Sequence, residues 1–168
     1  IFILENSEIN LFNIINKIKE LKICNPNILK PVLGDCSDKN FLRNTFFDKK
    51  IDEIYHAAAY KHVGFGEENP YSMLKNNIFG TKEMINFAIE KNVKNFIFIS
   101  SDKAVNPKSI LGYSKKFGEK LVKYFYSINK SKKTTKFTIV RFGNVIGSSG
   151  SVIPIFINQV LKKNYLTV

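Results

Sequence analysis

The chain has 168 residues, of which 44% are hydrophobic, and this length and composition suffice for one packed core. Its two cysteines, Cys24 and Cys36, form no Cys-x-x-Cys pair, which excludes a disulfide framework and favours a reducing, cytoplasmic setting. No apolar run reaches the roughly 20 residues needed to cross a bilayer, and residues 1–6 lack the basic start of a signal peptide. We therefore expect a soluble, cytoplasmic chain without membrane contact, although an anchor could lie in sequence beyond these residues.

The net charge of +12 suggests nucleic-acid binding at first sight, because clustered cations bind phosphates by releasing counterions. The basic residues are instead scattered along the chain, and nearly all of them are lysines. The only two arginines, Arg43 and Arg141, offer few guanidinium groups for base or phosphate recognition. The charge is better explained by a lysine-rich and asparagine-rich composition, and no nucleic-acid partner is expected.

Short apolar runs typical of strands alternate with segments whose apolar residues recur at helical spacing. Strands are expected at residues 1–4, 31–33, 51–56, 95–100 and 137–141. Helices are expected at residues 9–18, 84–89, 111–128 and 153–161. Because parallel strands need long crossovers that bury their apolar faces, the alternation predicts an α/β fold whose parallel sheet is covered on both faces.

Polar or small residues stand where several of these strands end, and ligands bind at the carboxyl ends of strands in such sheets. One crevice is therefore expected to be lined by Glu5, Asp35, Ala57–Ala59, Ser100–Lys103 and Phe142–Asn144. Glu5 is either a polar loop residue or the carboxylate that binds an adenosine ribose, and the three alanines indicate either close packing or the approach of a flat cofactor. His56 and His62, six positions apart, match no common zinc pattern, so no metal is expected.

The most informative segment is Ser100–Lys103, where hydroxyl, carboxylate and ammonium groups follow a buried strand. A carboxyl group beside an amine can serve as general acid and general base if burial and mutual charge bring their pKa values near neutrality. The alternative is a solvated loop. Lys115 lies one helical turn after Leu111 and is expected on the same helix face.

Five ordered motifs together resemble the capsular polysaccharide biosynthesis branch of the UDP-N-acetylglucosamine 4,6-dehydratases, within the extended short-chain dehydrogenase/reductase superfamily. These motifs are His56-Ala57-Ala58-Ala59-Tyr60-Lys61-His62-Val63, Glu67-Glu68-Asn69-Pro70, Asn77-Ile78-Phe79-Gly80-Thr81, Ser100-Ser101-Asp102-Lys103-Ala104-Val105-Asn106-Pro107 and Arg141-Phe142-Gly143-Asn144-Val145-Ile146-Gly147-Ser148-Ser149-Gly150-Ser151-Val152-Ile153-Pro154. The resemblance spans almost the whole chain and implies a Rossmann-like, doubly wound parallel sheet.

The resemblance also implies a reaction cycle in which hydride leaves sugar C4, water is eliminated across C5 and C6, and hydride returns to C6. Lys103 resembles the base at C5, Asp102 the acid for the C6 hydroxyl, and Ser101 the hydroxyl that contacts the reacting sugar. Lys115 resembles the lysine that holds the nicotinamide ribose and lowers neighbouring pKa values through its charge.

A tightly held NAD or NADP, regenerated in each cycle, and a UDP-sugar are the ligands that this resemblance implies. The cofactor residues would be Glu5, Asp35, Cys36, Ala57, Ala58, Ala59, Ser100 and Lys115. The sugar and its diphosphate would be bound by Lys61, His62, Asn144, Ser151 and Val152. Glu5 favours NAD electrostatically, because its carboxylate would repel a 2′-phosphate.

The chain departs from the family pattern at two places. Leu111 stands where the superfamily usually has a tyrosine, as in a dehydratase branch with methionine there, and Tyr113 is rotated away on the same helix. No Gly-x-x-Gly-x-x-Gly turn is present, so the first strand is expected to be missing and the fragment alone to be inactive. Residues 1–146 would form a partial dinucleotide-binding domain and residues 147–168 the start of an incomplete substrate domain.

Three functions stay open at this point. A 4,6-dehydratase is favoured, with the full-length protein expected to be a homo-oligomer. A nucleotide-sugar 4-epimerase would share the fold but normally needs the tyrosine that Leu111 replaces. A non-catalytic nucleotide-sugar-binding relative would explain Leu111 but not the retained Asp102–Lys103 pair.

Overall fold

The computed structural model describes residues 1–129, 135–145 and 152–163, and of residues 152–155 and 163 it describes the main chain alone. The expected domain boundary between residues 146 and 147 and the substrate residue Ser151 lie outside the described residues. Val152 begins a helix, and its side chain is also outside the description.

Strands and helices alternate along the chain, as the sequence predicts. The strands are β1 (Phe2–Glu5), β2 (Lys30–Leu33), β3 (Glu53–His56), β4 (Asn95–Ser101) and β5 (Lys136–Phe142). The helices are α1 (Glu8–Glu20), α2 (Lys39–Thr45), α3 (Val63–Glu68), α4 (Pro70–Leu74), α5 (Gly80–Glu90), α6 (Ile110–Asn129) and α7 (Val152–Lys163), joined by the short turns η1 (Pro26–Ile28), η2 (Lys75–Phe79) and η3 (Asp102–Ala104). The short helices α2, α3 and α4 were not predicted, because so few turns show little apolar periodicity.

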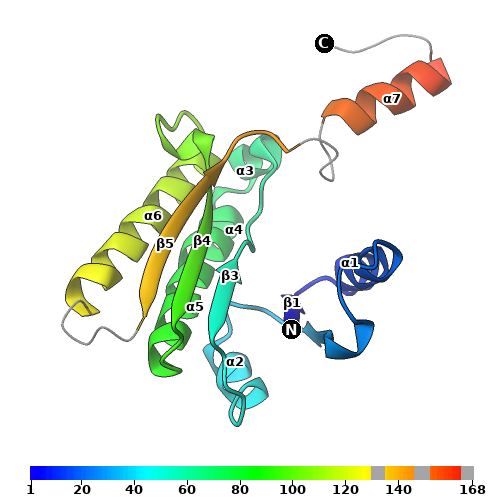
Figure 1. Cartoon of the computed structure of the whole chain (residues 1–168). Helices are drawn as coiled ribbons and strands as arrows, with labels where there is room; N and C mark the ends of the chain where they lie inside the picture. The colour runs from blue at the N-terminus through cyan, green and yellow to red at the C-terminus, as the bar shows by residue number, and fades with distance from the viewer. Residues whose placement is uncertain (130–134, 146–151, 164–168) are drawn as a thin grey trace.

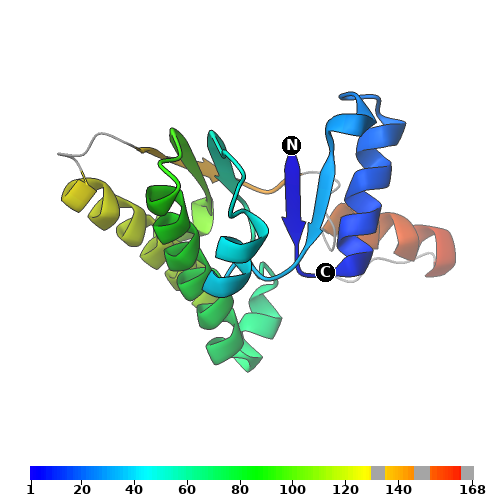
Figure 2. The same ribbon diagram turned by 90° about the horizontal axis from the view of Figure 1, so that it is seen from below.

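The strands form two parallel sheets. One contains β1 and β2, and the other contains β3, β4 and β5 in that order. The α/β class with parallel strands is confirmed, but within the described residues β1 and β3 do not pair, so the sheet is interrupted. Figures 1 and 2 both show β1 and β2 standing apart from the three-stranded sheet.

The three-stranded sheet is fully covered on one face. In Figure 1, helices α4, α5 and α6 lie behind it and no helix lies in front. The burial of β4 alternates accordingly, since Phe96, Phe98 and Ser100 are buried while Ile97 and Ile99 are only partly covered. The expected coverage on both faces is therefore not seen in the part of the chain that the structure describes.

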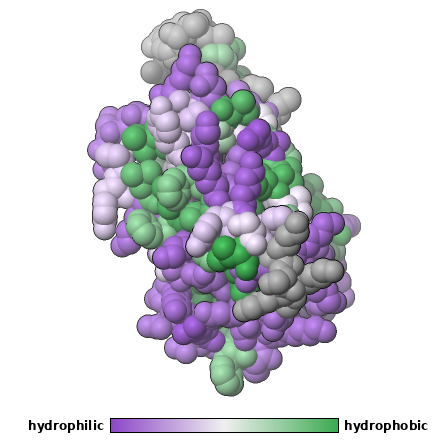
Figure 3. Space-filling view, turned by 90° about the vertical axis from the view of Figure 1, so that its left-hand side faces the viewer, coloured by the Kyte–Doolittle hydropathy of each residue, from purple (hydrophilic) through white to green (hydrophobic). Residues whose placement is uncertain are grey.

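The hydrophobic core lies between this sheet and helices α2, α5 and α6. Its largest fully buried side chains include Phe96, Phe98, Leu42, Ile85 and Val122. The two-stranded sheet packs against the core through Leu4 and Val32. The ring of Phe2 also meets that of Phe46 edge to face at 5.2 Å between centroids. Figure 3 views the molecule from the left-hand side of Figure 1 and shows a mostly hydrophilic surface with separate apolar patches.

Gly112, in the first turn of α6, allows this helix to touch the loop that follows β4. A Cβ at this position would lie 2.7 Å from the carbonyl oxygen of Lys103 and 3.1 Å from Cβ of Pro107. The nearest of these atoms belongs to the main chain and cannot rotate away. Gly112 therefore sets how closely α6 approaches the Ser101–Lys103 segment.

We expect Gly112→Ala to destabilise the protein by about 1–3 kcal/mol, because the added methyl group overpacks this contact. Gly64→Ala is the matched control, since a Cβ on that helical glycine would meet nothing within 4 Å. Urea unfolding of the two variants measures the difference. Equal stability of both variants would contradict the close approach.

Candidate active site

The carboxyl end of β4 gathers four polar side chains. The Ser101 hydroxyl donates to Oδ1 of Asp102 at 2.8 Å, and Nζ of Lys103 donates to the same oxygen at 3.2 Å. Lys103 Nζ also donates to Oδ1 of Asn144 at 3.2 Å, which links the ends of β4 and β5. The structure thus brings together the three predicted catalytic residues of the loop and one predicted substrate residue.

The Asp102–Lys103 pair is open to solvent, with side chains that are 55% and 39% exposed. The hydrogen bond from Ser101 and then that from Lys103 hold the pKa of Asp102 below its usual range. The sequence analysis required burial and mutual charge to bring the pKa of the general acid near neutrality. Asp102 does not meet this condition in the structure. A general acid at this position requires a ligand that excludes water and changes the charge on Lys103.

Lys115 lies behind this loop, on the buried face of α6. Its ammonium donates to the carbonyl oxygen of Ile99 at 2.9 Å and stands 5.1 Å from the centroid of the Phe98 ring. Burial lowers its pKa to about 8. The predicted position on the inner helix face is confirmed by the burial of both Lys115 and Leu111.

Leu111 is only 5% exposed and occupies the position where the superfamily tyrosine would stand. Its side chain carries no titratable group, and its carbonyl oxygen accepts a hydrogen bond from the Ser114 hydroxyl. Tyr113 is 56% exposed on the outer side of α6, as the helical rotation predicts. Neither residue supplies a proton donor on the buried face of this helix.

Glu119, one turn beyond Lys115, is a site-supporting residue that the sequence analysis missed. Its carboxylate accepts from the Ser100 hydroxyl at 2.6 Å and from Arg141 through Nε at 2.8 Å and Nη2 at 2.7 Å. Arg141 is the leading cause that lowers the pKa of Glu119. The Ser100 hydroxyl, predicted to meet the cofactor, is therefore directed at α6. Two charges four positions apart on an otherwise apolar helix face were the available signal.

Asn77 fixes the loop that follows β3, although the sequence analysis gave it no role. Its Oδ1 accepts from the main-chain N–H of Tyr60 at 2.8 Å, and its Nδ2 donates to the Tyr60 carbonyl at 3.0 Å and to the Ser114 hydroxyl at 3.0 Å. Thr81, one turn later, bonds the Asn77 carbonyl and lies 3.0 Å from Nε2 of His56. These contacts hold the Ala57–Lys61 segment against α6.

A cavity of about 170 Å³ connects the carboxyl ends of β1 and β3. Its lining includes Glu5, Cys36, Ala58 and Ala59. Glu5 Oε1 accepts from the main-chain N–H of Ser7 at 3.1 Å, and burial is the main cause that raises the pKa of the Cys36 thiol to about 11. Asp35 is not part of this lining, and its carboxylate accepts from the Ser37 N–H at 2.7 Å.

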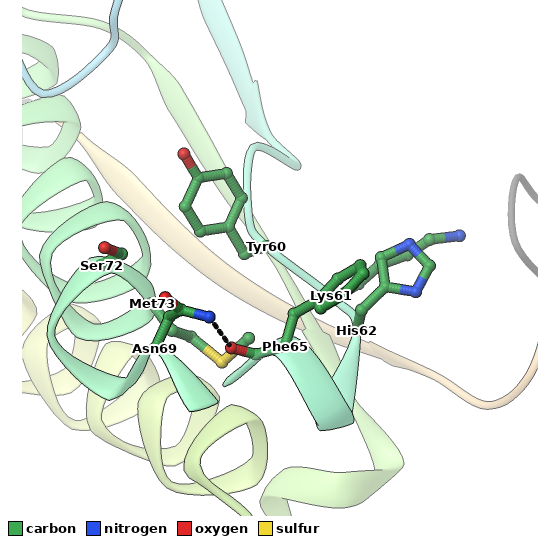
Figure 4. A pocket seen from close by; sticks show the side chains of 7 residues that line it. All are labelled: Tyr60, Lys61, His62, Phe65, Asn69, Ser72 and Met73. Carbon is green, nitrogen blue, oxygen red and sulfur yellow. Dashed lines mark hydrogen bonds between the residues drawn. The ribbon is translucent and has the colours of Figure 1, made fainter. Parts of the chain in front are cut away.

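A second cavity of about 310 Å³ lies between the loop after β3 and helices α3 and α4 (Figure 4). It is lined by Tyr60, Lys61, His62, Phe65, Asn69, Ser72 and Met73. Figure 4 shows Asn69 Nδ2 bonded to the Phe65 carbonyl, which closes α3 onto the start of α4. Two predicted substrate residues, Lys61 and His62, therefore share one cavity, and Tyr60 lines both cavities.

The residues present fit part of a dinucleotide. Glu5 places a carboxylate on the wall of the first cavity, where ribose hydroxyls could donate to it, and the alanines leave the opposite wall free of long side chains. Among the described residues, no glycine-rich turn offers main-chain amides to a pyrophosphate. In the same described ranges, no group of three His, Cys, Asp or Glu side chains could hold a metal, and no helix is long and apolar enough to cross a membrane.

Parallel strands, helical crossovers and polar groups at the strand carboxyl ends define a Rossmann-type α/β fold. The chain belongs to the polysaccharide biosynthesis protein family, whose model matches residues 1–168. This finding confirms the family resemblance that the five motifs carry.

Curated relatives support the assignment. The chain is 43% identical over 82% of its length to the capsular polysaccharide biosynthesis protein CapD of Staphylococcus aureus, covering 22% of that protein. It is 40% identical over 80% of its length to a UDP-N-acetylglucosamine 4,6-dehydratase (inverting) of Campylobacter jejuni, covering 39% of it. It is 37% identical over 96% of its length to a UDP-glucose 4-epimerase of Rickettsia bellii, covering 47% of it. The chain thus spans less than half of each relative.

A solved structure shows the same arrangement of elements. The X-ray structure of Pen from Bacillus thuringiensis superposes with a TM-score of 0.87 at 35% identity, over 99% of this chain and 49% of that chain. The two sheets of the present structure therefore have the relative placement found in a protein about twice as long.

His56 offers a test of burial through pH. Burial, followed by the charge of Lys115, lowers the pKa of His56 to about 3 in the folded state. Between pH 6.5 and about 3, His56 is protonated in the unfolded chain but neutral in the folded chain. The free energy of unfolding therefore falls as the pH falls through this range. At pH 5 this loss amounts to roughly 2 kcal/mol. We expect His56→Gln to remove this part of the pH dependence in urea unfolding at pH 5 and pH 7.5, and an unchanged slope would contradict it.

Two arginine–glutamate pairs of similar geometry differ in burial and form a matched set. Glu119, with a side chain 5% exposed, pairs with Arg141, whereas Arg43 and Glu90 are 49% and 41% exposed. Arg141→Met leaves a buried carboxylate without its cation, so we expect a clearly larger loss of stability than for Arg43→Met. Thermal unfolding compares them, and equal shifts would contradict a structural role for Glu119.

Proposed function

We propose that the protein carrying these residues is a nucleotide-sugar 4,6-dehydratase that uses NAD or NADP and forms a 4-keto-6-deoxy sugar from a UDP-N-acetylglucosamine-like substrate. The observation that carries the proposal is the Asp102–Lys103 contact of 3.2 Å at the end of β4, bounded by Ser101 and Asn144. Elimination of water needs a base and an acid side by side, and this pair supplies both.

The Asp102–Lys103 pair can share one proton between the carboxylate and the amine. In solvent the hydrogen bond from Ser101, followed by that from Lys103, lowers the pKa of Asp102 and keeps its carboxyl group ionised. Transfer of the proton from Nζ to Oδ1 yields a neutral amine and a neutral acid without exchange with solvent. A sugar that covers both groups favours this neutral form, since low dielectric disfavours separated charge.

The neutral pair matches the elimination. The amine of Lys103 would remove the proton at C5, and the carboxylic acid of Asp102 would protonate the departing C6 hydroxyl. After the step the pair is again an ammonium beside a carboxylate, which is the form that the hydrogen bonds favour in the structure. Ser101 would bind the sugar. The C4 hydroxyl proton would pass to solvent, because Asp102 already holds the proton from Lys103 and Leu111 has no titratable group.

A bound nicotinamide would accept hydride from C4 and return it to C6. Glu5 would hold the adenosine ribose, Cys36 would meet the adenine and Ala57–Ala59 would flank the nicotinamide half. Asp35 and Ser100 would contribute through their main chain, because both side chains are engaged elsewhere. Lys115 would present its ammonium to the nicotinamide ribose and contribute a positive charge beneath the site.

The substrate would be bound by residues that follow β3 and by residues that follow β5. Lys61 would offer a cation to the diphosphate, and His62 and Asn144 would contact the sugar together with Ser151 and Val152. We assign residues 1–146 to cofactor binding and residues 147–168 to the start of the substrate region. We also propose that the whole enzyme is cytoplasmic and forms a homo-oligomer.

A nucleotide-sugar 4-epimerase is the second candidate, favoured by the relative of that name in Rickettsia bellii. Such an enzyme exchanges a proton at the C4 hydroxyl, and the buried Leu111 offers none. The Asp102–Lys103 pair would have no use in epimerisation at C4. These two observations favour the dehydratase over the epimerase, and the Asp102–Lys103 pair favours it over a non-catalytic relative.

The test uses the whole protein that contains these residues, incubated with UDP-N-acetylglucosamine in deuterated water and followed by NMR. We expect a 4-keto-6-deoxy product with deuterium at C5. Asp102→Asn and Lys103→Met should each lower kcat by at least about 100-fold, the usual contribution of a positioned acid or base. Tyr113→Phe, on the exposed side of α6, should keep wild-type kcat. A UDP-N-acetylgalactosamine product would identify the epimerase, and absent turnover with cofactor bound would contradict both activities.

A further inference from the structure

Two side chains meet just beyond the ends of β4 and β5. Ser101 and Phe142 are the last paired residues of the two strands. Lys103 and Asn144 each follow two positions later, and Nζ of Lys103 donates to Oδ1 of Asn144 at 3.2 Å. Nζ also donates to Oδ1 of Asp102 at 3.2 Å. The amine therefore has one acceptor in its own loop and one that follows the neighbouring strand.

A buried carboxylate fixes how these two strand ends lie relative to each other. Ser100 and Arg141 are opposite residues in the register of β4 and β5. Glu119 accepts from the Ser100 hydroxyl at 2.6 Å and from Arg141 Nη2 at 2.7 Å, and its side chain is only 5% exposed. Because these bonds are charge-assisted and shielded from water, they are stronger than the bonds of the exposed loop. Glu119 thus sets the alignment that brings Asn144 to Lys103.

We propose that Asn144 is a positioning residue for the base, because its Oδ1 holds one N–H of Lys103 and thereby directs the lone pair of the amine toward C5 of the sugar. The inference rests on the proposed dehydratase activity and adds a role to Asn144. Its Nδ2 contacts the sugar, while its Oδ1 holds the amine. Glu119 supports this contact from α6, through the alignment of the strand ends.

The direction of the Lys103 lone pair decides whether the amine can take a proton from C5. A neutral lysine amine carries two N–H groups and one lone pair around Nζ. The carboxamide oxygen of Asn144 can only accept, so the position that faces it favours an N–H and disfavours the lone pair. Without this acceptor the lone pair would be free to turn toward the end of β5.

Asp102 restricts the amine on its other side. After Lys103 has passed a proton to Asp102, the acid turns that proton toward the departing C6 hydroxyl, and its oxygen accepts an N–H from Nζ. One N–H then faces Asp102, the other faces Asn144, and the lone pair takes the remaining position. The C5 proton moves to that lone pair, and the C6 oxygen leaves as water with the proton from Asp102, so both protons are accounted for.

Asn144 carries no charge, and the proton transfer depends on this. A carboxylate at the same place would put a second negative charge beside Nζ and keep the proton on Lys103. The carboxamide oxygen orients the amine through its dipole alone. An asparagine therefore positions the base without opposing the transfer of its proton to Asp102.

The first experiment compares the whole wild-type protein with Asn144→Ala and Asn144→Asp, using UDP-N-acetylglucosamine with hydrogen or deuterium at C5. We expect each variant to lower kcat at least about tenfold, because a misdirected or protonated base removes the proton more slowly. The C5-deuterium isotope effect on kcat should rise in both variants, since proton removal becomes slower relative to the other steps. Asn40→Ala, which removes an exposed amide on α2, is the matched control and should keep the wild-type kcat and isotope effect.

A rise in KM with unchanged kcat would make Asn144 a substrate contact only. A lower kcat with an unchanged isotope effect would show that the substitution reduces the amount of folded enzyme and leaves proton removal as it was. Either result would overturn the proposal.

The second experiment needs no substrate and measures the contact itself. Trinitrobenzenesulfonate reacts with neutral amines, and its addition to single lysines of the whole protein is followed by mass spectrometry of peptides. Asn144→Asp should slow the labelling of Lys103 about threefold, the effect of an exposed ion pair, and leave that of Lys120 unchanged on the exposed side of α6. Equal labelling of Lys103 in both proteins would overturn the proposal. If the wild-type protein formed no keto sugar, the proposed function itself would fall, and this labelling would still report whether residue 144 acts on Lys103.

Discussion

The inner face of α6 carries two charged side chains into the protein, and the candidate site depends on how they are held. Lys115 reaches the Ile99 carbonyl in the middle of β4, and Glu119 binds Ser100 together with Arg141 from β5. These contacts tie one helix to two strands directly beneath the Ser101–Lys103 loop. Gly112 then lets the helix start touch that loop. The polar cluster at the strand ends is therefore positioned by main-chain and charge-assisted contacts, not by its own exposed side chains.

The two buried charges are stabilised differently. Glu119 has a cation and a hydroxyl as partners, which lowers its pKa. Lys115 has a carbonyl oxygen and an aromatic face, which compensate burial only in part, and its pKa falls to about 8. Between that value and the ordinary lysine value, the unfolded chain holds more protons, so this residue makes the protein more stable as the pH rises. A cation kept at such a cost indicates a functional position more than a structural one.

Much of the fold followed from local pattern. β4 and α6 are long and strongly periodic, and both lie within about two residues of the expected bounds. The interruption between β1 and β3 could not be read from periodicity, because pairing is a long-range property. The cavity lined by Glu5 and Ala58 lies between two segments that are far apart in the chain, and local sequence patterns do not predict the distance between them.

The site was predictable where the residues with reactive side chains are consecutive in the sequence. Ser101, Asp102 and Lys103 are adjacent in sequence and form one hydrogen-bonded cluster. Asn77 and Glu119 were missed because each acts through partners far along the chain, at Tyr60 and Arg141. The inward orientation of the Ser100 hydroxyl likewise depends on a helix that a strand-end pattern does not reveal.

Tyr60 lines both cavities beside the loop after β3. This shared position could link ligand binding in one cavity to ligand binding in the other. The main chain of Tyr60 is fixed on both sides by Asn77, so its ring is the part that can respond to a ligand in either cavity. A molecule that fixed the ring on one side would change the free energy of binding on the other, and the effect would be equal in both directions. Tyr60 is thus the residue through which a ligand in one cavity would affect binding in the other.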